Sequence, residues 1–176
     1  MGHGTRERTW TEIERRIVCG ELPGGARIDE DALAGDLAVE TPVVREGYPV
    51  VILLEGLAVR STAQFPPESI ARLREINAAM AEEGANQMAA ATRDWEFHDE
   101  LVRHCGNEQL LSTLRPLKRL MLRYEYHYMA TEDFVSRSVH QHEAIIEALE
   151  NGDRERASAL VEDNFRDSMP GILEQL

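Results

Sequence analysis

The sequence predicts a mainly α-helical protein in which a small N-terminal head precedes an antiparallel all-helical bundle. Three observations support this fold class. Ala, Leu, Glu and Arg are abundant and aromatic residues make up only 6% of the 176 residues, a composition that favours helix. From residue 66 onward, apolar residues recur three and four positions apart, in segments separated by Gly, Asn or Pro. The 43% hydrophobic content is typical of a globular chain with a core.

The head alternates short helical segments with turns. Apolar residues at helical spacing predict a helix over 7–18, Asp29 is suited to cap a second helix, and Pro42 is suited to begin a third. Residues 55–60 (E-G-L-A-V-R) have the pattern of a short strand that follows a turn. Three helices and a strand are the outline of a winged helix-turn-helix, a fold that binds DNA, and we expect this domain over residues 1–62.

The bundle is expected over residues 66–176, where helical segments follow one another without a strand. Gly, Asn and Pro residues divide this region and mark where each segment ends. The expected helices cover residues 66–83, 88–104, 108–129, 134–149 and 154–173.

Charge and composition limit the possible partners. The formal net charge is −13, so the chain does not attract nucleic acid as a whole, and any DNA contact needs a local basic patch. No apolar run approaches the roughly 18 residues of a membrane span, and no secretory signal is visible. Cys19 and Cys105 are far apart and form no paired motif, which suits a reducing compartment. We therefore expect a cytoplasmic protein.

Four polar residues are predicted to point toward the bundle core. Asp94 and His98 lie four positions apart on one helical face, and His142 and Asn164 each lie on the apolar stripe of another helix. Buried polar groups need partners, and helical bundles often build metal or ligand sites from facing helices. A carboxylate with imidazoles suits Zn²⁺ or Ni²⁺, but spacing alone favours a hydrogen-bonded network that satisfies itself.

The sequence carries no familiar catalytic motif. It has no Gly-rich phosphate loop, nucleophile elbow or paired-histidine protease motif, so we do not expect an enzyme. The alternative is a metal-dependent hydrolase that uses the Asp94 cluster, which would need an open coordination position to activate water.

The head resembles that of the GntR superfamily of transcriptional regulators. Residues 17–39 are similar to the opening of that head, and V-R-E (44–46) and L-E-G-L-A-V (54–59) resemble its recognition helix and the start of its wing. The resemblance implies that the DNA-binding residues are Arg27, Thr41, Arg45 and Arg60.

The bundle resembles the effector domain of the FadR branch, called FCD. The residues that carry this resemblance are D-W-E-F-H (94–98), G-N-E-Q-L-L (106–111), H-E-A-I-I-E-A-L-E-N-G-D (142–153) and the A-x-x-L-V-x-x-N-F pattern (157–165). The resemblance implies a ligand-responsive bacterial transcriptional regulator, and a repressor is expected. Such a protein binds operator DNA as a homodimer and senses a small carboxylate-type metabolite.

The same resemblance implies a divalent metal site. Asp94, His98 and His142 match metal-ligand positions, and Asn164 occupies a position where a third histidine is usual. Because an amide oxygen is a weaker ligand than imidazole, we expect a weaker site or a different metal preference. The residues expected to bind the effector are Arg119, Arg123 and His140.

Three departures from the family pattern support an alternative function. Glu40 would repel phosphate, and Pro49 lies inside the expected recognition helix, where proline costs about 3 kcal/mol. The long first helix of such effector domains is also expected to be missing or very short before residue 66. The alternative is a metabolite- or metal-binding sensor module that has lost specific DNA binding.

Overall fold

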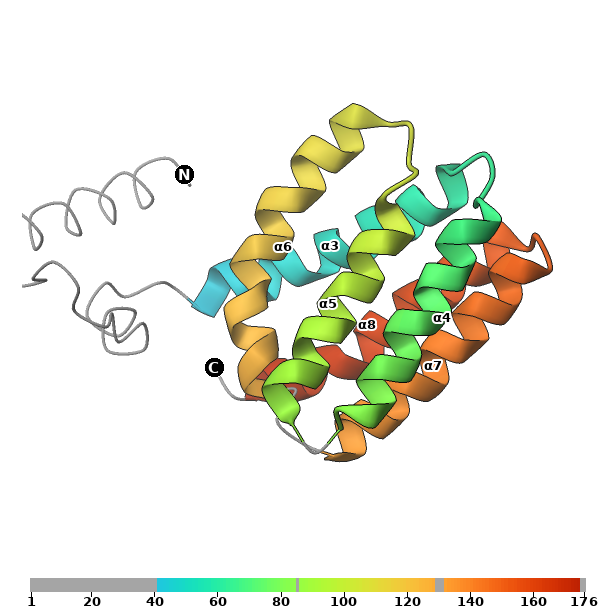
Figure 1. The fold of residues 1–176 in the computed structure, drawn as a ribbon. Coiled ribbons are helices and arrows are strands. Elements are labelled where there is room, and N and C mark those ends of the chain that lie inside the picture. Colours follow the sequence, from blue (N-terminus) through green and yellow to red (C-terminus); the bar gives the residue numbers. More distant parts are fainter. Residues whose placement is uncertain (1–40, 85, 129–131, 175–176) are drawn as a thin grey trace, which may run out of the picture. The chain divides into compact units, whose positions relative to one another are not determined.

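The computed structural model describes residues 41–84, 86–128 and 132–174, which form six helices and no strand (Figure 1). The chain divides into two compact units, residues 1–43 and 44–176, and of the first unit only residues 41–43 are described. The expected helix over 7–18, the helix capped by Asp29 and the proposed DNA contact Arg27 lie outside the described residues. The helices are α3 (Thr41–Ser61), α4 (Pro67–Glu82), α5 (Gln87–Val102), α6 (Glu108–Tyr128), α7 (Glu132–Glu150) and α8 (Arg154–Glu174).

The five helices expected after residue 66 are all present, and the boundaries that the structure describes at Asn86 and at Gly152–Asp153 lie where the sequence predicts them. Asn86 caps α5 by accepting a hydrogen bond from the Ala89 N–H. Gly152 has a φ of +70°, which glycine adopts without a steric penalty, and it reverses the chain between α7 and α8. Asp153 then caps α8 through the Arg156 N–H at 3.0 Å. The mainly helical fold class is therefore confirmed.

The strand expected over residues 55–60 was wrong, because these residues belong to the continuous helix α3. Tyr48, Val51, Ile52, Glu55, Ala58 and Val59 are all buried and recur at helical spacing along one face. That face packs into the core, so a helix satisfies both the backbone and the apolar side chains. Helix α3 thus lies almost wholly in the compact unit that spans Val44–Leu176, together with the five helices that follow it.

Pro49 lies inside α3 without interrupting it. Its side chain is exposed, so the proline ring faces away from the core and meets no buried neighbour. The cost of the missing backbone N–H therefore falls on one hydrogen bond of a helix whose buried face packs from Tyr48 to Val59.

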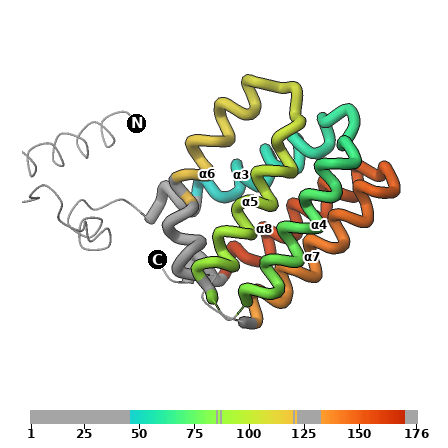
Figure 2. Tube along the Cα trace, viewed as in Figure 1, coloured from blue at the N-terminus to red at the C-terminus, as the bar shows by residue number. Residues whose placement is uncertain are grey.

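The helices pack as a bundle around one main core. Helix α4 packs against α5 and α7, and α7 packs against α8, as the chain trace in Figure 2 also shows. Phe97, Leu114, Ile145 and Val161 are fully buried and come from four different helices. No helix in the described part of the chain combines the length and apolarity needed to cross a bilayer.

Helix α3 crosses α8 at Gly56. The Ser158 hydroxyl donates to the Gly56 carbonyl oxygen at 2.8 Å, and a Cβ atom on Gly56 would lie 2.6 Å from Glu162 Oε1 and 2.7 Å from its Cγ. A side chain at residue 56 would therefore force the Glu162 side chain on α8 to move.

We expect Gly56→Leu to lower the free energy of unfolding by about 1–3 kcal/mol, because overpacking forces the surrounding structure to shift. Urea denaturation followed by circular dichroism measures this change. Gly106→Ala is the matched control, since a Cβ there has no neighbour within 4 Å and should change stability little. Adding Glu162→Ala to Gly56→Leu should recover part of the loss, and no recovery would show that the clash is not at α8.

Candidate metal centre

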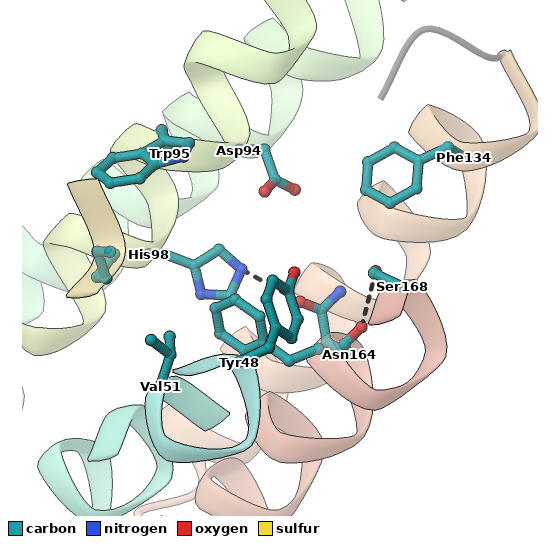
Figure 3. A pocket seen from close by; sticks show the side chains of 10 residues that line it. Tyr48, Val51, Asp94, Trp95, His98, Phe134, Asn164 and Ser168 are labelled. Carbon is teal, nitrogen blue, oxygen red and sulfur yellow. Dashed lines mark hydrogen bonds between the residues drawn. The ribbon is translucent and has the colours of Figure 1, made fainter. Parts of the chain in front are cut away.

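The four inward polar residues predicted from the sequence come together between three helices. Asp94 and His98 come from α5, His142 from α7 and Asn164 from α8, and all four are buried. One ligand atom each of Asp94, His98 and His142 lies within 4.8 Å of the others. Asn164 Oδ1 is 3.1 Å from His98 Nε2, and Figure 3 shows Asp94, His98 and Asn164 around the same space.

His142 is held with one ring nitrogen directed at this cluster. Its Nδ1 is 3.2 Å from Asn77 Oδ1, and the Asn77 amide nitrogen donates to the Val139 carbonyl oxygen at 3.0 Å. This orientation of the amide makes Nδ1 the protonated nitrogen, so Nε2 keeps its lone pair. Burial and the neighbouring His98 lower the pKa of His142 well below its ordinary value, which keeps the ring neutral.

The lone pair of His142 Nε2 makes no hydrogen bond with any described residue. The nearest carboxylate atom is Asp94 Oδ1 at 3.4 Å, which already accepts a hydrogen bond from Ser138 at 2.7 Å. Phe97 stacks on the His142 ring with centroids 3.7 Å apart and closes one side of it. A buried nitrogen without a partner is costly, and a metal ion would satisfy it.

His98 contacts an acceptor at each of its ring nitrogens. Nδ1 is 2.9 Å from Glu55 Oε2, and Nε2 is 3.1 Å from Asn164 Oδ1. Burial favours the neutral ring, but the Glu55 and Asp94 carboxylates outweigh it and raise the pKa of His98. A doubly protonated ring would donate to both acceptors, and the raised pKa favours this form. A metal ion binding at Nε2 has to displace one proton, while the bond to Glu55 can remain.

The surroundings of Asp94 favour its uncharged form, whereas those of His98 favour the charged ring. Burial raises the pKa of the Asp94 carboxyl, and the nearby His98 and the hydrogen bond from Ser138 oppose this effect only in part. A cation beside Asp94 would stabilise its ionised form.

Two charged residues at the site were missed from the sequence, Glu55 and Lys118. Glu55 on α3 and Lys118 on α6 are buried, with Lys118 Nζ 2.6 Å from Glu55 Oε1 and 3.1 Å from Asp99 Oδ1. Glu55 was assigned to the expected strand, although it is the one acid in the apolar run 47–59. Lys118 lies four residues after Leu114 and three before Met121, and this core spacing was the available signal.

Glu55 and Lys118 hold each other in their charged forms. Burial alone would raise the pKa of Glu55, but Lys118 and His98 outweigh it and lower that pKa. Burial would likewise lower the pKa of Lys118, but the Glu55 and Asp99 carboxylates raise it. Since Glu55 also accepts the hydrogen bond from His98, the pair fixes the orientation of a predicted metal ligand.

Two cavities lie on either side of Trp95 and Lys118, which line both. The cavity beside the cluster has a volume of about 20 Å³, room for one water-sized group, and Asp94, His98 and Asn164 line it. The second is a groove of about 540 Å³ between α4, α5 and α6, which suits a small organic molecule. Its lining includes Arg72, Arg103, Arg115 and Arg119.

Of the remaining predicted residues, those whose side chains the structure describes do not join the cluster. Arg119 is exposed and lines the groove, whereas His140 is exposed on α7 and lines neither cavity. The side chains of Thr41, Arg45 and Arg123 lie outside the described part of the chain. Arg60 is exposed near the end of α3, 3.9 Å from Glu155, and not in a wing strand.

A family comparison matches the helical unit. The FCD domain matches residues 46–167, which is more than half of the chain and includes all four cluster residues and α3 from residue 46 onward. The chain belongs to the FCD domain family. This is the effector domain of GntR-family regulators, so the resemblance seen in the sequence is confirmed.

One solved structure similar to this FCD protein is that of Lar, described as controlling the expression of the Listeria monocytogenes agr system and mediating virulence. The TM-score is 0.61 and the identity 11%, and the match covers 97% of each chain. At this identity the similarity shows the fold alone. No curated protein matches this FCD protein.

We expect Lys118→Met to lower the free energy of unfolding by about 3–5 kcal/mol, because it leaves the buried Glu55 without its cation. Thermal or urea unfolding measures the loss. The matched control is Arg72→Met, which breaks the exposed ion pair with Glu75 and should cost less than about 1 kcal/mol. The double variant Glu55→Gln/Lys118→Met should recover most of the stability, and equal losses in Lys118→Met and the control would contradict the assignment.

Proposed function

We propose that this FCD protein is a ligand-responsive bacterial transcriptional repressor that binds operator DNA as a homodimer in the cytoplasm. In this proposal the FCD domain binds a divalent metal and senses a small organic acid. The observation that carries it is the buried cluster of Asp94, His98 and His142 inside an FCD domain, with the unpaired His142 Nε2 facing it.

The donor set of the cluster fits a borderline divalent ion such as Zn²⁺ or Ni²⁺. Two imidazole nitrogens, one carboxylate and the amide oxygen of Asn164 face the same space. Asn77 orients His142, and Glu55 orients His98, as hydrogen-bond acceptors commonly do for histidine ligands. When bound, the ion would supply a positive charge that attracts the carboxylate of an effector.

The groove between α4, α5 and α6 is the better candidate for the body of the effector. The cavity beside the cluster holds only a water-sized group, whereas the groove has the volume of a small-molecule site. Arg119 lines the groove, and Lys118 and Trp95 separate the groove from the cluster. We propose Arg119 as a cation for the effector carboxylate, with Arg123 on the same helix as a second candidate.

The proposed DNA contacts are Arg27, Thr41 and Arg45. Arg60 is not retained, because it was assigned to a wing strand and lies in helix α3 instead. Thr41 and Arg45 lie on the same continuous helix as Glu55, which hydrogen-bonds His98. A metal or effector that shifts His98 therefore acts directly on the helix that leads to the N-terminal unit. It changes DNA binding if the protein with ligand and the protein without ligand differ in affinity for DNA.

The second candidate function is a metal- or metabolite-binding sensor that does not select a DNA sequence. One observation favours it: residues 1–60 hold seven arginines and eleven acidic residues, so this region carries a net charge of −4. Acidic side chains near the phosphate backbone weaken binding.

Metal binding tests the cluster directly. We expect isothermal titration of the metal-stripped protein with ZnCl₂ or NiCl₂ to give one ion per chain, and His142→Ala or Asp94→Ala to lose at least about tenfold in affinity. His140→Ala is the control, because His140 lies on the same helix but is exposed. Asn164→His should raise the affinity, since imidazole is the stronger ligand. Unchanged binding in His142→Ala would rule out this site.

DNA selection separates the two functions. We expect in-vitro selection from a random library to recover one palindrome, with an affinity that falls steeply as salt rises. Arg45→Ala should weaken operator binding by about tenfold or more while metal binding stays intact. Recovery of no preferred sequence at low salt would favour the sensor without a DNA function.

A further inference from the structure

Helix α3 presents an apolar stripe to solvent on the side opposite its buried face. Val50, Leu53 and Leu57 have relative exposures of 42%, 59% and 36%, and Pro49 beside them is also exposed. At about 100° per residue, these positions fall within one narrow stripe of the helix. Contiguous exposed apolar surface of this kind marks an interaction site more often than chance exposure does.

The stripe has a negative charge at one end and a positive charge at the other, and both lie equally far from Leu53 at its centre. Glu46 lies seven residues before Leu53 and Arg60 seven residues after it, and both are exposed on the same side of α3. Seven residues span about 10 Å of helix, so the two charges lie roughly 10 Å on either side of Leu53 along the axis. The only ion pair that Arg60 makes with the described residues is the long, exposed one to Glu155 at 3.9 Å.

A surface with this symmetry is complementary to itself. If a second copy of α3 packs against the first in the antiparallel direction, Leu53 meets Leu53 on a twofold axis. Pro49 and Val50 then meet Leu57 of the other copy, and Glu46 meets Arg60 at both ends. A parallel arrangement would instead place Glu46 against Glu46 and Arg60 against Arg60, which is repulsive.

We propose that the exposed stripe of α3 is a homodimer interface in which two copies of this helix pair antiparallel about Leu53. The inference rests on the proposed function only in taking the chain to act as a homodimer; the surface itself is independent of metal and DNA. The inner face of the same helix carries Glu55 at the metal cluster, so the pairing places the two clusters on either side of one helix pair.

The oligomeric state of the full chain tests this interface. Light scattering after size exclusion should give twice the chain mass of 19.9 kDa for the wild type at about 10 µM. Leu53→Glu should raise the dimer dissociation constant at least about a hundredfold, because it removes two facing leucines and opposes two carboxylates. Met88→Glu is the matched control, since Met88 is 62% exposed on α5 and away from the stripe.

The charges and the register are tested separately. Glu46→Arg should weaken the dimer by about tenfold, and adding Arg60→Glu should restore it, because the end charges are then exchanged. Leu53→Cys should form a disulfide-linked dimer under mild oxidation, whereas Met88→Cys and the wild type, whose Cys105 is buried, should not.

Three results would overturn the interface. These are a monomeric wild type, a dimer whose mass Leu53→Glu leaves unchanged, and a failure of Leu53→Cys to crosslink. The first result is expected if residues 1–43 of the same chain cover the stripe, and the second if the dimer uses another face. Zinc titration of Leu53→Glu distinguishes this failure from a failure of the metal site, because a monomer with an intact cluster still binds metal.

Discussion

Glu55 carries a negative charge at full burial, and three helices are arranged so that this charge is compensated. Lys118 from α6 lies 2.6 Å from one oxygen of Glu55, and His98 from α5 lies 2.9 Å from the other. Taking a carboxylate out of water costs several kcal/mol unless charged partners and hydrogen bonds replace the solvent. The positions of α3, α5 and α6 are thus tied to one another through a single side chain.

This constraint also orients the cluster of Asp94, His98, His142 and Asn164. Because Glu55 occupies His98 Nδ1, only Nε2 of that ring faces Asp94 and Asn164. Asn77 has the same role for His142, whose Nε2 remains without a hydrogen-bond partner in the described part of the chain. Both rings are therefore oriented before any ion binds, so binding does not have to order these side chains. This is the usual advantage of a preorganised site.

Helix α3 connects the cluster with two other surfaces of the protein. Its buried face carries Glu55 and crosses α8 at Gly56, and its N-terminal end leads toward residues 1–40. Its outer face carries the stripe around Leu53, between the charges of Glu46 and Arg60. Among the described residues, α3 therefore carries both a contact to the cluster and the exposed apolar stripe.

The sequence by itself determined the helical class, the five helices after residue 66 and the inward direction of four polar residues. Those features depend on spacing along one chain: Asp94 and His98 share a face because they lie four residues apart, and Gly152 with Asp153 marks a helix boundary locally. The likeness to the FCD domain followed from the same motifs, and the match over residues 46–167 confirms it.

Only the tertiary structure decided the nature of residues 41–61 and the partners of the cluster. A short apolar run such as residues 55–60 fits a strand or a helix equally well, and packing against α8 is what selects the helix. Glu55 and His98 are 43 residues apart, and periodicity along one segment contains no information about such a pair. The buried charges Glu55 and Lys118 were missed for this reason: a charged residue is stable in a core only when another helix supplies its partner, and that partner is fixed by the fold.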